Sequence, residues 1–184
     1  MFRYLLIISI SLLSSCSSIE KKDCSTLNWH DQGMKDGEEG RRSTYFLQHA
    51  LKCTTKPDEK MYTKGRLEGL RVFCSSYGGF KDGLAGHAYL GQCSSFKSED
   101  KFKTAHRLGM DAFRQNEENL DNKEKISELE RKIVSEFHNL EELRDLRFDK
   151  SILEKDLLRG VDFYNDILDK ARSRKYFKKP KQER

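Results

Sequence analysis

The feature that most constrains the fold is a repeated pattern of small residues at three- and four-residue spacing. The segment 33–40 recurs as 79–86 with five of eight positions identical, and shorter versions lie at 65–69 and 105–109. On a helix, the glycines of one unit fall within about 60° of one another and form a smooth stripe. Each interior glycine costs about 1 kcal/mol of helix stability relative to alanine. We therefore expect these stripes to serve the close approach of another helix.

Polar and proline openings predict where the helices around this pattern begin. Asn28 precedes Trp29 with Asp31 at the third helical position, which is typical of a capping box, and Pro57 and Ser98 open two further segments. We expect helices near 28–52, 58–74, 79–92 and 98–115. The glycines could instead mark turns between strands, because residues 77–83 resemble one hairpin of the MORN repeat with a glycine spacing one residue too short. The prediction is a mainly α chain with a glycine- and cysteine-rich helical domain at 28–115.

The first 15 residues predict export. They carry one basic residue, Arg3, followed by an apolar run that is too short for the roughly 20 apolar residues that a membrane-spanning helix needs. The next positions, Leu13 to Cys16, resemble the lipobox of bacterial lipoproteins, in which the cysteine receives a diacylglycerol and becomes the new amino terminus. We expect cleavage of residues 1–15, lipidation of Cys16, and a tether over 16–27. Because Ser17 replaces the aspartate that signals retention in the inner membrane, the expected location is the outer membrane, facing the periplasm.

Four cysteines remain after the lipidated one, namely Cys24, Cys53, Cys74 and Cys93. In an oxidising compartment an even set predicts two disulfides, whereas the Cys-x-x-Cys pairs typical of zinc sites are absent from the sequence. Four cysteines allow three connectivities. If the helices run up, down and up, the cysteines at equal height are Cys24 with Cys74 and Cys53 with Cys93. We expect these disulfides to staple the helical domain.

The segment 116–175 has no cysteine, and its acidic and basic residues alternate densely. Its apolar residues keep the three-and-four spacing of an amphipathic helix or a coiled coil, so the helical domain is followed by a coiled-coil-like extension. This extension could be one long helix or a hairpin turning near 147–151. An apolar stripe of this length needs cover, so we expect a protein partner or self-association through 120–170. The residues that set the pattern are Ile126, Leu129, Ile133, Leu140 and Leu143, with Phe137 near the same face and Ile152, Leu153, Leu157, Val161, Tyr164 and Leu168 beyond the turn.

The chain ends in a basic tail at 176–184. From Lys170 onward there are eight Lys or Arg and one acid, with Tyr176 and Phe177 among them. In the envelope the expected partner of such a tail is an anionic polymer or membrane phosphate, with no role for nucleic acid. A frayed, solvated terminus is the alternative.

The order of glycine, aromatic and cysteine positions over 24–113 resembles the Domain of Unknown Function 2799 family of bacterial envelope proteins. Phe73 departs from the pattern, which has tyrosine there. The resemblance implies an envelope location and disulfides, and it implies no activity or catalytic residue. The positions compared, all matching except Phe73, are Cys24, Trp29, Gly33, Asp36, Gly37, Gly40, Cys53, Tyr62, Gly65, Arg66, Gly69, Leu70, Phe73, Cys74, Gly79, Gly83, Gly86, Tyr89, Cys93 and Gly109.

Three carboxylates at the edges of the glycine stripes are the candidate binding residues. Asp36, Glu68 and Asp82 each precede the second glycine of a unit, so they could bind a cation or a small ligand. The favoured alternative is that they are solvated carboxylates paired with a neighbouring lysine such as Lys35 or Lys81. The five histidines form no zinc-binding pair, and no nucleophile elbow or phosphate loop occurs. We therefore expect a non-enzymatic structural or interaction protein without cofactor or metal, with ligand binding as the alternative and an enzyme third.

Overall fold

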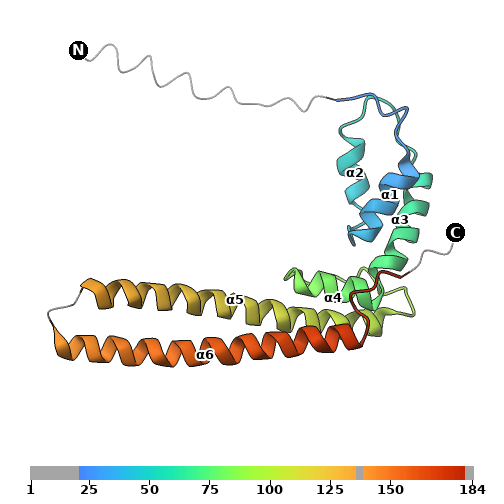
Figure 1. The fold of residues 1–184 in the computed structure, drawn as a ribbon. Helices are drawn as coiled ribbons and strands as arrows, with labels where there is room; N and C mark the ends of the chain where they lie inside the picture. Colours follow the sequence, from blue (N-terminus) through green and yellow to red (C-terminus); the bar gives the residue numbers. More distant parts are fainter. Residues whose placement is uncertain (1–20, 136–138, 181–184) are drawn as a thin grey trace, which may run out of the picture.

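The computed structural model describes residues 21–135 and 139–180 and is mainly α within these ranges (Figure 1). They contain no strand, only an isolated bridge between Lys22 and Cys53. None of the helices in these ranges is both long and apolar enough to span a bilayer. The predicted fold class is confirmed. The helices are α1 (Trp29–Glu38), α2 (Tyr45–Ala50), α3 (Glu59–Phe73), α4 (Ser76–Leu84), α5 (Glu99–Ser135) and α6 (Leu140–Ser173).

The first module, residues 24–73, is built on the packing of α1 against α3. A Cβ atom at Gly33 would collide with the carbonyl of Tyr62, and one at Gly69 would collide with the carbonyl of Met34. The backbones of the two helices therefore touch where side chains would otherwise hold them apart. The prediction that the glycine stripes allow close helix approach is confirmed.

The second module, residues 74–113, repeats the same arrangement with α4 and the start of α5. Gly79 faces the backbone of Phe102, and a Cβ at Gly83 would collide with the carbonyl of His106. From α5, Gly109 packs against the backbone of Phe80, as Gly69 does against Met34. The sequence repeat is thus a repeat of a whole helix pair.

The first helix of each module ends at a glycine that no other residue could replace without strain. Gly40 has φ +67° and Gly86 has φ +76°, both in the left-handed region, and the rings of Phe73 and Phe113 fill the space where a Cβ would lie. This turn divides the predicted helix 28–52 into α1 and the short α2. The corresponding turn at Gly86 ends the predicted helix 79–92 at Leu84.

The disulfides join Cys24 to Cys53 and Cys74 to Cys93, with Cα–Cα distances of 5.5 and 5.4 Å. The predicted pairing of Cys24 with Cys74 and of Cys53 with Cys93 is wrong. It assumed one straight helix from 28 to 52, but the turn at Gly40 returns the chain to the level at which it started. Each disulfide therefore closes one module, joining the residues that precede its two main helices.

The rest of α5 and all of α6 form an antiparallel hairpin, hereafter the arm, which extends sideways from the modules (Figure 1). The reversal lies between Ser135 and Leu140, so the predicted turn at 147–151 is wrong, since those residues are inside α6. Leu140 is 83% exposed and Phe137 lies outside the described residues. Residues buried or half-buried toward α5 recur every three or four positions along α6, as in a coiled coil: Leu143, Leu146, Lys150, Leu153, Leu157, Gly160, Tyr164, Ile167 and Ala171.

Beyond α6 the tail folds back onto both modules. Tyr176 is buried, the ring of Phe177 meets that of Phe80 edge-on with centroids 5.1 Å apart, and Lys179 pairs with Glu38 of α1 at 2.8 Å. Tyr176, Phe177 and Lys179 thus contact the modules, although residues 177–180 are exposed to solvent.

Candidate functional site

Asp36 lies at the centre of a buried polar network in the first module. Its side chain, on α1, accepts a hydrogen bond from the Tyr62 hydroxyl at 2.7 Å and contacts His49 Nε2 at 2.8 Å. Gln32 Nε2 is 3.4 Å from the carboxylate and Arg41 Nε is 3.7 Å from it. With only 2% of its surface exposed, Asp36 is not the solvated carboxylate of the alternative prediction.

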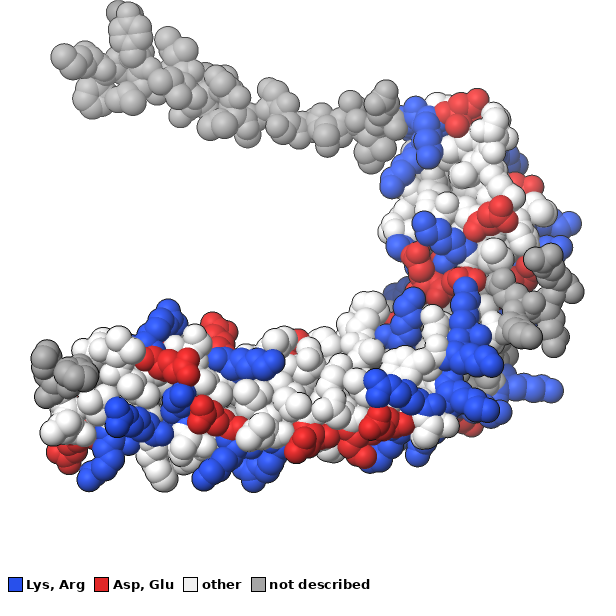
Figure 2. Space-filling model, viewed as in Figure 1, with Lys and Arg blue, Asp and Glu red and all other residues white. Residues whose placement is uncertain are grey.

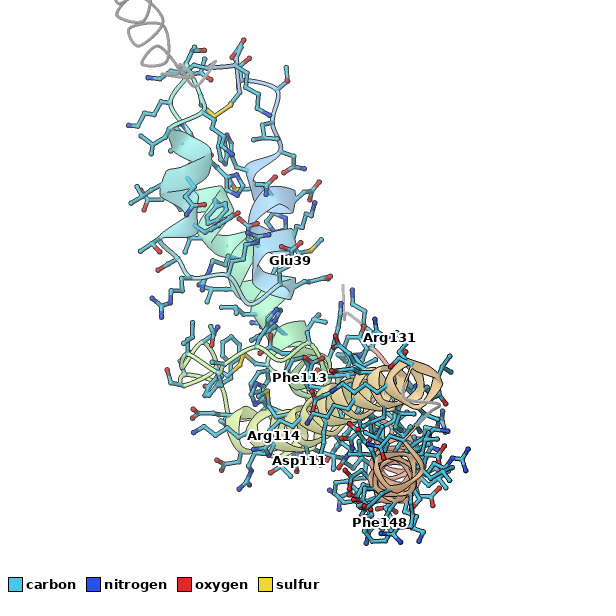
Figure 3. The ribbon with its side chains drawn as sticks, turned by 90° about the vertical axis from the view of Figure 1, so that its left-hand side faces the viewer. Glu39, Asp111, Phe113, Arg114, Arg131 and Phe148 are labelled. Carbon is cyan, nitrogen blue, oxygen red and sulfur yellow. A yellow bond between two sulfur atoms is a disulfide. The ribbon has the colours of Figure 1, made fainter. Side chains whose placement is uncertain are left out.

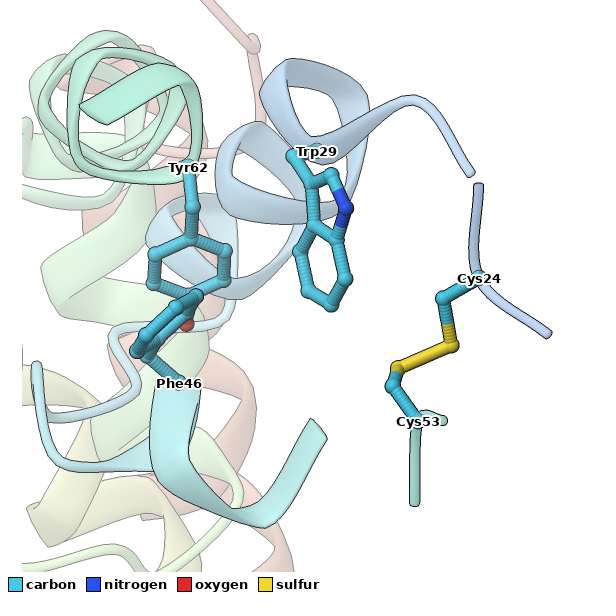
Figure 4. Close-up of a cluster of buried hydrophobic side chains, with 5 residues drawn as sticks. All are labelled: Cys24, Trp29, Phe46, Cys53 and Tyr62. Atoms are coloured by element: carbon cyan, nitrogen blue, oxygen red, sulfur yellow. A yellow bond between two sulfur atoms is a disulfide. The ribbon is translucent and has the colours of Figure 1, made fainter. Parts of the chain in front are cut away.

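The local sequence explains why these groups meet. The Asn28 side chain caps α1 by accepting from the backbone N–H groups of His30 and Asp31. The turn at Gly40 and the disulfide at Cys53 then hold α2 against α1, so that His49 reaches Asp36. Aromatic packing completes the cluster in Figure 4, with the Phe46 ring 5.8 Å from Trp29 and 5.1 Å from Tyr62 between centroids.

Burial and the nearby carboxylate shift the ionisation of Asp36's neighbours. Burial, together with the hydrogen bond to Asp36, raises the pKa of Tyr62 well above its usual range. Burial also lowers the pKa of Arg66, whose guanidinium donates to the Arg41 carbonyl from Nε at 2.9 Å and from Nη2 at 2.6 Å. Tyr62 is therefore a neutral donor that stabilises the buried carboxylate.

Asp82 occupies the position of Asp36 in the second module but has different partners. It contacts His87 Nδ1 at 3.0 Å and His106 Nε2 at 3.6 Å, and His106 Nε2 is also 2.8 Å from the His87 carbonyl. In the aligned repeat, His87 replaces Arg41, His106 replaces Arg66, and Phe102 replaces Tyr62. Sequence reasoning treated the histidines one at a time and missed this pairing, although alignment of the two modules would have indicated it.

Glu68 lies on α3 and is 3.1 Å from His30 Nε2, with 40% of its side chain exposed. Among the described residues, Glu68 shares no partner with Asp36 or Asp82, so the structure does not bring the three candidate carboxylates into one site. Their partners are histidine, tyrosine and arginine side chains; the predicted pairing with Lys35 or Lys81 is not observed within the described ranges. No group of three or more His, Cys, Asp or Glu that could hold a metal occurs among residues 21–135 and 139–180.

A cleft of 420 Å³ lies where the two modules meet. It is enclosed by the ends of α1 and α3, one face of α4, and the returning tail. Its floor is apolar and its rim is charged. The lining residues are Glu38, Glu39, Arg41, Val72, Phe73, Tyr77, Gly78, Lys81, Asp82, Ala85, His87 and Lys179.

The arm carries apolar side chains that its own packing leaves exposed. Acidic and basic residues alternate along the face of the arm in Figure 2, with neutral surface between them. The view in Figure 3 runs nearly along the arm and shows Phe148 on the side of α6 that faces away from α5. The exposed apolar residues of the arm are Leu120 (51%), Val134 (78%), Leu140 (83%), Phe148 (64%), Ile152 (42%), Leu158 (67%) and Phe163 (51%).

Comparison with known proteins finds a family model that matches the part of the chain forming the two modules. Residues 28–111 match a family model described as "Protein of unknown function (DUF2799)". The matched segment begins at the cap of α1 and ends within α5, so it covers most of both modules and leaves out the distal arm and the tail. No curated protein and no solved structure matches the chain. The segment 28–111, which contains the paired glycine helices, is therefore the part of the chain that matches the DUF2799 family of proteins of unknown function.

Proposed function

We propose that this protein is a lipoprotein of the bacterial cell envelope, anchored by acylation of Cys16 after removal of the signal peptide 1–15. The support for the anchor is the short apolar run with Arg3, followed by Leu13 to Cys16, which lies outside the described residues. Two disulfides support an oxidising compartment, because thiols in the cytoplasm are kept reduced. The proposed location is the outer membrane facing the periplasm, with Ser17 after the anchor.

Within the envelope, the proposed role is non-enzymatic contact with another protein or with a second copy of the chain, made by the arm. The observation that carries this proposal is the set of apolar side chains exposed on α5 and α6, such as Phe148 at 64% and Phe163 at 51%. Apolar groups of this size cost free energy when they stay in water, so a surface that keeps several of them favours association. The modules then carry the arm, because α5 belongs both to the second module and to the arm.

Binding of a cation or small ligand by Asp36, Glu68 and Asp82 has less support. Asp36 is 2% exposed, and its oxygens already meet Tyr62 and His49, so a ligand would have to displace these groups. The basic tail could contact an anionic envelope polymer, although Lys179 is paired with Glu38 inside the protein. These contacts rank below association through the arm.

Crosslinking in living cells tests the role of the arm. We expect the full-length protein to form a covalent adduct with a partner or with itself, and we expect that adduct to be lost when Phe148 and Ile152 are both changed to Gln. The matched control changes Lys155 and Asp162, which are exposed on the same helix, to Gln. An adduct that persists in F148Q/I152Q, or capture of the monomer alone, would contradict the proposal.

A further inference from the structure

We propose that the cleft between the two modules binds a small monoanion that has an apolar body, such as a medium-chain carboxylate, with Lys81 contacting the anionic head. The cleft volume of 420 Å³ is within the usual range for small-molecule sites. This binding role is separate from association through the arm, because no residue of the arm helices beyond the second module lines the cleft.

The cleft exists because the second module lacks a counterpart of α2. Twelve residues separate Gly40 from Cys53, and they include α2, whereas six residues separate Gly86 from Cys93. In the first module, His49 of α2 covers the face of α1 that carries Gln32 and Asp36. The corresponding residues of α4 are Gly78 and Asp82, and both line the cleft.

The shorter connection covers only part of this region. Tyr89 packs on Phe102 with ring centroids 5.0 Å apart, as Phe46 packs on Tyr62 at 5.1 Å. Its aromatic group thus replaces Phe46, and His87 of the connection contacts Asp82 at 3.0 Å as His49 contacts Asp36 at 2.8 Å, but the described connection contains no helix that corresponds to α2. The second module therefore has no helix in the place of α2, and the cleft lies beside the part of α4 that carries Lys81 and Asp82.

The floor of the cleft suits an apolar body. Val72 and Phe73, at the end of α3, are each 5% exposed and form a surface that does not need to rearrange. Gly78 and Ala85 add little bulk on the α4 side, and Tyr77 adds an aromatic edge. An aliphatic chain of several carbons would cover this floor and remove its remaining apolar surface from water.

The charges on the rim favour an anionic head. Each acid has a cationic or imidazole partner, with Glu38 paired to Lys179 at 2.8 Å, Glu39 to Arg41 at 2.6 Å, and Asp82 to His87 at 3.0 Å. Lys81 is the lining cation for which no ion pair is found among the described residues. A carboxylate beside Lys81 would therefore complete the charge pairing, whereas an ammonium group would meet an unpaired positive charge.

Three probes with one apolar body and different heads test this site: octanoate, 1-octanol and octylammonium. We expect octanoate to shift the backbone amide signals of Gly78 and Ala85 in ¹H–¹⁵N spectra of the full-length protein with both disulfides intact. Octanol should bind about fivefold more weakly, and octylammonium more weakly still, because an ion pair at a partly exposed site contributes up to about 1 kcal/mol.

Two variants and a matched control locate the interaction. K81M should reduce the affinity for octanoate to that for octanol, and K81E should reverse the preference toward octylammonium. The control K35M changes the equivalent lysine of the first module and should leave binding unchanged. A85F, which places a ring in the cleft, should abolish the shifts while the thermal unfolding transition is retained. Equal binding of all three probes, equal loss in K35M and K81M, or shifts confined to the arm would each overturn the proposal.

Discussion

The Tyr62 hydroxyl donates a hydrogen bond to Oδ2 of Asp36 over 2.7 Å, with Tyr62 1% and Asp36 2% exposed. A buried carboxylate is stable only when donors replace the water that it loses. Tyr62 comes from α3 and Asp36 from α1, so this bond joins the two main helices of the first module beside the disulfide-linked α2.

Removing that donor should destabilise the first module. We expect Tyr62→Phe to lower the free energy of unfolding by about 1–3 kcal/mol, because it removes the Tyr62 hydroxyl, one of the hydrogen-bond donors to a buried carboxylate. The control Tyr164→Phe removes a hydroxyl from a half-buried tyrosine of α6 whose side chain has no hydrogen bond to any residue in 21–135 or 139–180. Urea denaturation of both variants under non-reducing conditions measures the difference. Equal effects of the two substitutions would show that the Asp36 contact contributes nothing specific.

The same contact predicts a loss of stability at alkaline pH. Burial and the hydrogen bond to Asp36 raise the pKa of Tyr62 in the folded protein. The folded state therefore keeps the proton over a range in which the unfolded state, with a tyrosine pKa of about 10, releases it. The stabilising contribution of the Tyr62 proton is complete below the unfolded-state pKa of about 10. It is lost as the pH rises from that value through the raised pKa of the folded state.

The measurement is the difference in unfolding free energy between the wild-type protein and Tyr62→Phe as a function of pH. The other tyrosines are present in both proteins, so their effects largely cancel. We expect this difference to shrink or change sign above a pH of about 10, the ordinary tyrosine value. A difference that stays constant through that range would contradict a raised pKa for Tyr62.

Substituting a glycine at the contact of α1 with α3 should cost stability despite the better helix propensity of alanine. A Cβ at Gly37 would collide with the Arg66 carbonyl and lie 2.9 Å from the Leu70 nitrogen. Overpacking against backbone typically costs about 1–3 kcal/mol, and it has to exceed the gain of about 1 kcal/mol from the added methyl group. We expect Gly37→Ala to be net destabilising in thermal unfolding.

Gly160→Ala is the matched comparison on the arm. There a Cβ meets the side-chain amides of Asn119 and Gln115, which can turn aside, instead of fixed backbone. We therefore expect a change in unfolding free energy of less than about 1 kcal/mol. A larger loss for Gly160→Ala than for Gly37→Ala would show that the repeated spacing of small residues in the modules does not serve direct backbone contact.

Each disulfide should stabilise its own module by a similar amount. The bonds close sequence separations of 29 and 19 residues. Because the entropy of the unfolded chain depends on the logarithm of loop length, replacing either pair by alanine should cost about 3–4 kcal/mol. Urea denaturation of C24A/C53A and C74A/C93A measures both losses. A large loss in one variant with none in the other would show that the two modules are not equivalent in stability.

The glycine spacing predicts which helices contact one another, but it does not predict that the chain reverses at Gly40. The glycine spacing at 33–40 and 79–86 correctly predicts helices that meet through small residues. A glycine inside a helix and one in the left-handed conformation look identical in the sequence, so the pattern predicts helix through Gly40, where the structure has a turn. The wrong disulfide pairing follows from this one error, because a chain that reverses brings Cys53 back beside Cys24.

In the candidate site and the arm, too, the sequence predicts some features and leaves others to tertiary packing. Asp36 and Asp82 were found from their place beside the glycines, but their partners His49 and His106 lie far along the chain and depend on tertiary packing. The apolar spacing of 116–175 predicts an extended amphipathic helix or hairpin, and it does not locate the turn. Leu140 and Leu143 fit one continuous pattern, although Leu140 is 83% exposed and Leu143 is 6% exposed in the hairpin.

Mass spectrometric mapping of the native protein, isolated without reduction, tests the central account most directly. That account is an exported, lipid-anchored chain made of two modules, each closed by its own disulfide. It predicts an acylated amino-terminal Cys16 and crosslinked peptides joining Cys24 to Cys53 and Cys74 to Cys93. Retention of residues 1–15, four free thiols, or peptides joining Cys24 to Cys74 would contradict it.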